Sequence, residues 1–97
     1  MTTAFVYLLR SVKDGSSYVG WTTDLRRRLE EHNAGKTPDT QTRGPWKLVA
    51  YETYEDSEAA QQRERNLKRN PRMLSLFKKW AINVFRTASG GPRQVVG

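Results

Sequence analysis

Residues 4–10, AFVYLLR, place the tightest constraint on the fold, because they are apolar, aromatic or β-branched on both faces of an extended chain. A run of this length and composition predicts a buried β-strand. The Asp14–Gly15 pair supplies a turn, and YVGW at 18–21 predicts the returning strand of a hairpin. The fold is therefore expected to be built around a small antiparallel sheet.

Helix signals follow the hairpin. Asp24, with Thr22 and Thr23 as alternatives, is a candidate N-cap for a helix that runs to about Asn33 and ends at Gly35. A polar loop then leads to WKLVAYETY at 46–54, which predicts a third strand.

The second half of the chain is predicted to be helical. Asp56 or Ser57 caps a second helix that ends at Asn70, because proline disfavours helical geometry in the residue before it. Pro71 suits the first turn of a third helix, capped by Asn70. The third helix carries an apolar stripe at spacings of three and four, formed by Met73, Leu76, Phe77 and Trp80.

The predicted order is β-β-α-β-α-α, which indicates the α+β class: a small, three-stranded, mainly antiparallel sheet flanked by helices. Residues 1–85 form one domain, and residues 86–97 are expected to be a flexible C-terminal tail because they combine turn formers with little periodicity.

Charge is distributed unevenly along the 97 residues. The net charge is +7, and residues 57–97 carry all of it, with nine Lys or Arg against two acidic residues. A basic face on a small domain fits a polyanion, nucleic acid before an anionic membrane, although a merely solubilising surface is the alternative.

The chain contains no cysteine, so a disulfide framework and a thiolate metal site are both excluded. No apolar run approaches the length of a membrane span, and the N-terminus lacks the pattern of a signal peptide. These features predict a cytoplasmic location without membrane association.

Two polar residues stand where a helix needs core residues. Arg28 and His32 share a stripe with Leu25 and Leu29 on the first helix, so the Arg28 head must reach an anion. The anion is either functional or the carboxylate of Asp24, one turn earlier.

The second helix repeats the pattern with the opposite sign. Glu64 shares a face with Ala60 and Leu67, and a carboxylate among core contacts needs a cation. The cation is either a basic neighbour, Arg63 or Lys68, or a divalent metal ion, since one carboxylate plus waters is typical of magnesium sites. Tyr7 and Tyr18 on the hairpin, taken singly, are core residues with a hydrogen-bonded hydroxyl. Gly20 leaves room for a closely approaching ligand or helix, although a simple turn from strand to helix explains it as well.

In combination, four segments resemble a GIY-YIG nuclease domain, and most closely its small stand-alone bacterial members. They are FVYLLRS at 5–11, YVG at 18–20, DLRRRLEEHNAG at 24–35 and EAAQQRERNLK at 58–68. Phe5 and Val6 replace the glycine and isoleucine of the first motif. The family asparagine has no position with convincing spacing, although Asn66, Asn70 and Asn83 are available.

The resemblance implies a metal-dependent endonuclease that hydrolyses phosphodiester bonds, with DNA favoured over RNA. It assigns catalytic positions to Tyr7, Tyr18, Arg28, His32 and Glu64, and the motif glycine to Gly20. We expect Glu64 to hold one Mg²⁺ or Mn²⁺ and Arg28 to bind the phosphate. Tyr7 is the favoured general base, with Tyr18 orienting the water, provided that cations lower the phenol pKa from about 10. His32 bonds the phosphate or relays a proton.

The basic residues of the second and third helices are expected to hold the nucleic-acid backbone without reading its sequence. They are Arg63, Arg65, Lys68, Arg69, Arg72, Lys78 and Lys79. The lack of a recognition domain predicts low intrinsic sequence specificity, with targeting left to an unidentified protein partner. The alternative is a non-catalytic nucleic-acid-binding module on the same fold.

Overall fold

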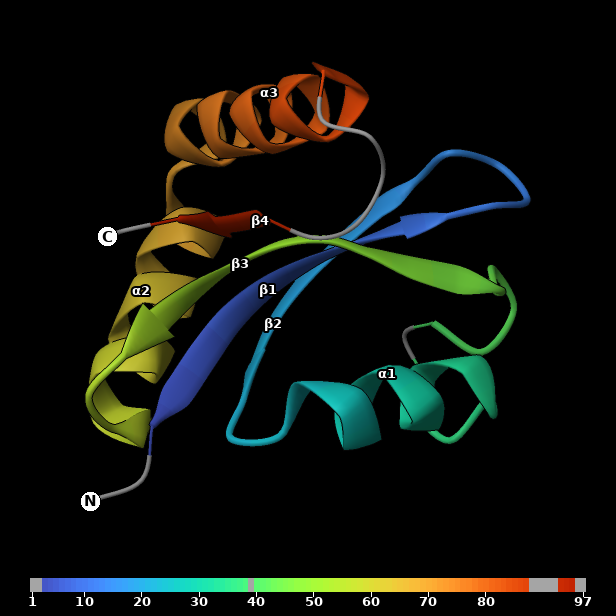
Figure 1. The fold of residues 1–97 in the computed structure, drawn as a ribbon, viewed down its shortest axis with the longest axis horizontal. Helices are drawn as coiled ribbons and strands as arrows, with labels where there is room; N and C mark the ends of the chain where they lie inside the picture. The colour runs from blue at the N-terminus through green and yellow to red at the C-terminus, as the bar shows by residue number, and fades with distance from the viewer. Residues whose placement is uncertain (1–2, 39, 88–92, 96–97) are drawn as a thin grey trace.

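The computed structural model, drawn in Figure 1, describes residues 3–38, 40–87 and 93–95, with side chains through Ala81. Its elements follow the order β1 (Ala4–Ser11), β2 (Ser17–Thr22), α1 (Leu25–Asn33), β3 (Trp46–Tyr54), α2 (Ser57–Arg69), α3 (Pro71–Thr87) and β4 (Arg93–Val95). No helix in these ranges combines the length and the apolar character needed to cross a bilayer.

The sheet has the strand order β2-β1-β3-β4. Strand β1 pairs antiparallel with β2 and β3, which confirms the predicted three-stranded antiparallel sheet. Strand β4 adds a parallel pairing to β3, with Arg93 opposite Ala50 and Val95 opposite Glu52.

The C-terminal part differs from the tail expected for residues 86–97. Helix α3 continues through Thr87, and residues 93–95 form β4. A three-residue strand is too short to show a periodic pattern in the sequence. The remaining residues of that segment, 88–92 and 96–97, lie outside the described ranges.

Both faces of β1 are buried, each under different helices. Val6 and Leu8 belong to the core that includes residues of α2 and α3, among them Leu67 and Phe77. Tyr7 and Leu9 belong to a second cluster, which Leu25 and Leu29 of α1 contact. Figure 1 shows α1 apart from α2 and α3. The strand is therefore apolar on both faces because each face meets its own core.

The helix caps lie where the sequence predicts them. The carboxylate of Asp24 accepts a hydrogen bond from the Arg27 backbone N–H at 3.1 Å, and Asp56 accepts one from Ala59 at 2.8 Å. The Asn70 side chain accepts from the Met73 backbone N–H at 3.1 Å and so caps α3. Each cap satisfies a backbone donor that the helix itself leaves unpaired.

The apolar stripe expected on α3 is only partly buried. Phe77 is 7% exposed, but Met73 is 41%, Leu76 59% and Trp80 42% exposed. The face that packs on the sheet instead carries Leu74, Phe77 and Ala81. Both sets have helical spacing, so periodicity alone did not select the buried one.

Candidate active site

The two tyrosines of the hairpin lie on the α1 side of the sheet. Tyr7 stands opposite Gly20 in the β1–β2 ladder, and Leu9 stands opposite Tyr18. Because side chains alternate along a strand, Tyr7 and Tyr18 point to the same face. Their ring centroids are 6.4 Å apart.

Gly20 makes room for the Tyr7 phenol. A Cβ atom at residue 20 would lie 2.4 Å from Tyr7 Oη, 2.7 Å from its Cζ and 3.2 Å from Tyr18 Cε2. These distances are far below van der Waals contact, so only glycine permits this ring position. The group that approaches Gly20 closely is therefore a side chain of the site itself.

Helix α1 supplies two partners to the Tyr7 hydroxyl. His32 Nε2 lies 2.8 Å from Tyr7 Oη, and Arg28 Nε donates to the same oxygen at 3.4 Å. The sequence places Arg28 and His32 one turn apart on the core stripe, and that spacing aims both side chains at the buried phenol.

A threonine pair holds the other side of the imidazole. His32 Nδ1 lies 2.7 Å from Thr40 Oγ1 and 2.9 Å from Thr37 Oγ1. His32 is 1% exposed and Thr40 is fully buried. Because Tyr7 Oη accepts a hydrogen bond from Arg28, we assign the phenol O–H as the donor to His32 Nε2. The neutral imidazole then carries its own proton on Nδ1.

Burial raises the pKa of Tyr7 to about 12. The nearby Tyr18 and Glu64 add to the increase, and Arg28 opposes it through its hydrogen bond and its charge. A general base at neutral pH was expected to need a lowered phenol pKa, but the pKa of Tyr7 is raised, because desolvation outweighs the effect of Arg28. Tyr7 therefore keeps its proton at neutral pH.

Arg28 pairs with a different carboxylate from the one expected. Its Nη1 lies 3.1 Å from Glu31 Oε1, whereas Asp24 is the N-cap of the helix. The Arg28–Glu31 pair is about one-third exposed, so it is worth little to stability. A pocket of about 330 Å³ opens beside Arg28 and is lined also by Trp21, Thr22, Thr23, Arg27 and Glu31.

Glu64 approaches the same group of residues from α2. Its carboxylate contributes to the raised pKa of Tyr7, and its Oε1 lies 3.3 Å from Lys68 Nζ. The Lys68 ammonium also lies 5.3 Å from the Tyr18 ring centroid, a cation–π contact. The structure thus brings Tyr7, Tyr18, Arg28 and His32 into contact, and Glu64 is linked to this group through Lys68.

The donor set fits one hard divalent cation. The Glu64 side chain is 20% exposed, and its partner Lys68 is 46% exposed, so the lysine can move aside at little cost. A single carboxylate leaves the other positions of a Mg²⁺ ion to water and substrate oxygens. No cluster of three or more His, Cys, Asp or Glu side chains that could hold a metal occurs within the described ranges.

Arg63 lies outside this site. Its Nε and Nη2 donate to the two carboxylate oxygens of Glu52 at 3.0 and 3.2 Å, and Glu52 is 1% exposed. Tyr54 also donates to Glu52, at 2.7 Å. Arg63 was assigned to nucleic-acid binding from its place in a basic run, but it is committed to this buried carboxylate. We therefore expect no backbone contact from it.

The other basic side chains predicted to bind nucleic acid lie at the surface. Exposed positions are occupied by Arg65, Lys68 and Arg69 on α2 and by Arg72 and Lys79 on α3, and Lys78 is half-buried. They remain available to a polyanion.

Sequence reasoning missed the threonines that hold His32. Thr37 and Thr40 lie in the polar loop between α1 and β3, and their hydroxyls bond each other as well as the imidazole. Trp46 Nε1 donates to the Thr40 carbonyl at 3.0 Å and fixes the loop. The available signal was weak: a loop rich in threonine that follows directly after a buried histidine.

The comparisons with known proteins identify the family of the chain. A family profile described as the GIY-YIG catalytic domain matches residues 3–76. A UPF0213 protein of Clostridium perfringens is 44% identical over 73 residues, which cover 74% of this chain and 77% of the relative. A UPF0213 protein of Streptococcus pneumoniae serotype 4 is 44% identical over 70 residues, 71% of this chain and 70% of the relative.

One solved structure is similar in sequence. It is the solution NMR structure of the UPF0213 protein BH0048 from Bacillus halodurans, with 38% identity over 76% of this chain and 84% of that chain, at a TM-score of 0.45.

Proposed function

The chain belongs to the GIY-YIG catalytic domain family, and from this premise we propose that it is a metal-dependent endonuclease of low intrinsic sequence specificity, with DNA favoured over RNA. Family membership places it among nucleases. The metal requirement, the preferred nucleic acid and the role of each residue belong to the proposal.

One observation supports the proposal: α1 and the hairpin hold Tyr7, Arg28 and His32 in contact, and the Glu64 partner Lys68 contacts the Tyr18 ring. The phenol is hydrogen bonded to both Arg28 and His32. A protein that only binds nucleic acid has no need for a partly buried carboxylate beside a phenol in a basic domain. Hydrolysis needs a proton acceptor, a cation for the phosphate and a carboxylate for the metal ion.

The raised pKa of Tyr7 decides how the phenol can act as a base. At a pKa of about 12, only about one molecule in 10⁵ carries a phenolate at neutral pH. Tyr7 therefore accepts a proton from the attacking water while it passes its own proton to His32 Nε2, 2.8 Å away. Both ring nitrogens of His32 already have hydrogen-bond partners, Tyr7 on one side and Thr37 and Thr40 on the other, so we assign it the relay.

The other residues position and stabilise the reacting groups. As the water oxygen bonds to phosphorus, the bond from phosphorus to the 3′ oxygen breaks, and solvent protonates the leaving oxygen. Arg28 donates from the pocket side to a non-bridging phosphate oxygen. Tyr18 orients the water from the neighbouring strand. Glu64 would hold the Mg²⁺ or Mn²⁺ ion, which supplies Lewis-acid stabilisation of the phosphate and leaving oxygens.

A second candidate is a non-catalytic nucleic-acid-binding module. The observation in its favour is the Glu64–Lys68 pair, which already neutralises the carboxylate without a metal ion. The two candidates differ in turnover but not in binding, so both quantities must be measured together.

The deciding experiment incubates the full chain with labelled linear, branched and single-stranded DNA and RNA in Mg²⁺, Mn²⁺ or EDTA. We expect metal-dependent cleavage by the wild type, loss of cleavage in Glu64→Ala with binding retained, and normal cleavage in Glu58→Ala, an exposed acid on the same helix. Binding by the wild type without cleavage of any substrate would reject the endonuclease in favour of the binding module.

A further inference from the structure

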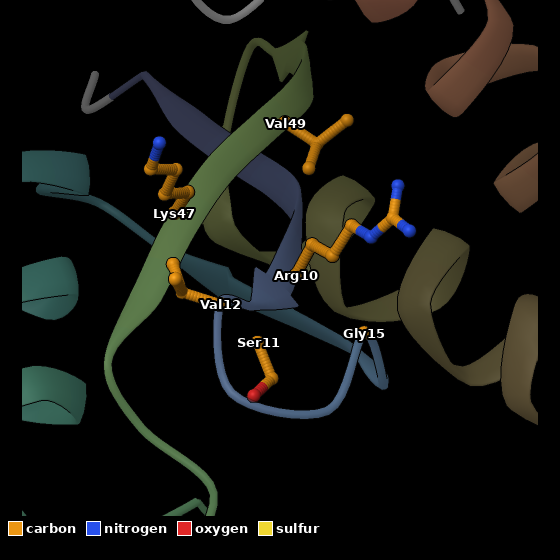
Figure 2. A pocket seen from close by; sticks show the side chains of 6 residues that line it. All are labelled: Arg10, Ser11, Val12, Gly15, Lys47 and Val49. Carbon is orange, nitrogen blue, oxygen red and sulfur yellow. The ribbon is translucent and has the colours of Figure 1, made fainter.

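A pocket of about 360 Å³ lies at the hairpin end of the sheet, away from the candidate active site. It is lined by Arg10 and Ser11 at the end of β1, Val12 and Gly15 in the turn, and Lys47 and Val49 of β3 (Figure 2). None of the residues assigned to hydrolysis lines it. Its volume is within the range of small-ligand sites.

The pocket and the active site lie on opposite sides of β1. Tyr7 belongs to the cluster on the α1 side. Arg10 is three positions further along the strand, so alternation turns its side chain to the opposite face. The rise of an extended chain places the Arg10 backbone about 10 Å from that of Tyr7. A nucleic-acid strand that occupies both sites must pass round the edge of the sheet, because β1 is a central strand.

Two cations stand side by side on this part of the sheet. Arg10 and Lys47 are direct partners in the β1–β3 ladder. Like charges in that relation repel each other, and no carboxylate lines the pocket to offset them. The nearest acid in sequence, Asp14, accepts from the Ser16 backbone N–H, and the cation that acts on it is Arg43. An anion from outside would therefore be stabilised here.

The shape of the pocket indicates an extended ligand. Figure 2 shows Arg10 and Lys47 extending to opposite sides, so that their charged ends do not converge on one point. The Arg10 guanidinium lies beside Gly15, with Nη2 3.6 Å from where a Cβ would stand. Apolar surface is offered by Val12, which is 57% exposed. A ligand that meets both cations needs separated negative groups and an apolar part between them.

The turn that carries Val12 and Gly15 is held in place before any ligand arrives. The buried Ser11 hydroxyl accepts from the backbone N–H groups of Lys13 and Asp14 at 3.1 and 3.2 Å and donates to the Arg43 carbonyl at 2.5 Å. The Val12 backbone N–H donates to the Pro45 carbonyl at 2.9 Å. Binding would therefore cost little ordering of the backbone.

We propose that this pocket binds a single-stranded segment of the nucleic-acid substrate, with successive phosphates at Arg10 and Lys47 and a sugar or base against Val12. A base must leave its stack to enter the pocket, which favours a single strand over a duplex. The inference rests on the proposed nucleic-acid substrate but on no catalytic residue. It predicts that preferred substrates carry a single-stranded region beyond the cleavage point, long enough to pass round the edge of the sheet.

The test measures binding of a labelled oligothymidylate to the full chain in EDTA, over a series of salt concentrations, with a duplex of equal length in parallel. Arg10→Gln and Lys47→Gln remove one cation each, and Val12→Ser removes the apolar contact. Lys13→Gln is the matched control, because Lys13 is exposed on the same turn but does not line the pocket.

We expect the double variant Arg10→Gln/Lys47→Gln to bind the oligothymidylate at least about tenfold more weakly and to lower the salt slope by about 1.4, since each single-strand phosphate contact contributes about 0.7. Lys13→Gln should change the affinity less than about twofold, as expected of a charge without a direct contact. Val12→Ser should weaken single-strand binding severalfold without changing the slope, because it removes apolar contact only. In NMR spectra, the Val12 and Gly15 amide signals should shift on binding.

Three outcomes would overturn the proposal. An unchanged slope in the double variant would show that neither cation meets a phosphate. An equal loss in Lys13→Gln would show a general charge effect. Equal effects on the duplex, or saturation by adenosine monophosphate at the affinity of the oligomer, would exclude a strand site. The test measures binding and not cleavage. A failure of this proposal can therefore be distinguished from a failure of the endonuclease proposal.

Discussion

Two buried polar clusters lie on opposite faces of the same sheet, and they use their arginines differently. On the α2 and α3 side, Arg63 donates two hydrogen bonds to Glu52, whose charge is removed almost completely from water. On the α1 side, Arg28 donates to a neutral phenol at 3.4 Å and to the surface carboxylate of Glu31. The Glu52 cluster neutralises its own charges. In the Tyr7 cluster, the Arg28 guanidinium can still bind a further anion.

The difference separates a structural ion pair, Arg63–Glu52, which we call the brace, from a candidate active site around Tyr7. The Arg63 charge is already neutralised by the buried carboxylate of Glu52, so an anion from outside would have to compete with that pair. A guanidinium at the edge of a pocket, above a phenol and an imidazole, can take a phosphate oxygen without breaking a buried ion pair. We therefore expect the largest loss of stability on the Glu52 side, and effects on activity only on the Tyr7 side.

The largest expected effect is on the brace. Arg63→Met should lower the free energy of unfolding by about 3–5 kcal/mol, because Glu52 would stay buried without a cation. Glu52→Gln should cost less, since Arg63 is 27% exposed and can turn towards water. Urea unfolding followed by circular dichroism measures both. Arg65→Met, exposed on the same helix, is the control. Equal stability of Arg63→Met and Arg65→Met would contradict the structural role.

This pair also shows where sequence reasoning stopped. Arg63 and Glu52 are eleven residues apart and belong to α2 and β3, so no local spacing links them. The buried side of α3 was only partly predicted for a related reason: Phe77 was expected in it, but Leu74 and Ala81 join the core only through the packing of the helix on the sheet. Pairings set by tertiary packing leave no periodic signal in one sequence.

The fold and the positions around Tyr7 could be predicted from the sequence more fully. Alternation along β1 and the spacing of three and four on α1 are local rules, and together they direct Tyr7, Arg28 and His32 to one place. The charge state of Tyr7 could not be predicted from the sequence, because the extent of desolvation depends on packing from several elements. Local chemistry thus located the side chains, and only the assembled fold determined the pKa direction.

The second prediction concerns the proton of Tyr7. Because the folded-state pKa of about 12 lies above the unfolded value of about 10, this group stabilises the fold fully below pH 10, and the contribution is lost as the pH rises through 12. The loss should amount to about 3 kcal/mol. Absorbance near 295 nm of wild type minus Tyr7→Phe should give a midpoint near 12, with circular dichroism reporting folding in the same samples. A midpoint near 10 would show that the phenol is not desolvated.

The third prediction tests the space that Gly20 leaves. Gly20→Ala should lower the free energy of unfolding by about 1–3 kcal/mol, because the new Cβ would lie 2.4 Å from Tyr7 Oη. Combination with Tyr7→Phe should cost less than the sum of the two single changes, since the closest atom is then gone. Urea unfolding of the three variants provides the cycle. Simple additivity would mean that the clash is not with the hydroxyl oxygen but with the ring Cζ, 2.7 Å from the new Cβ, or with another group.

The smallest expected effect comes from the threonine that orients the imidazole. Thr40→Val keeps the volume but removes a hydroxyl at 2.7 Å from His32 Nδ1, while Thr37 retains its bond at 2.9 Å. We expect a loss of about 1 kcal/mol in stability and a larger fraction of the other imidazole tautomer. His32 is the only histidine in the chain, so ¹⁵N labelling of histidine reports this one ring. The proton relay from Tyr7 needs the tautomer that is protonated on Nδ1, because Nε2 must accept the proton. Cleavage should therefore fall in proportion to the loss of this tautomer. An altered tautomer ratio with unchanged cleavage would leave the histidine a structural support, similar in kind to the brace on the other face.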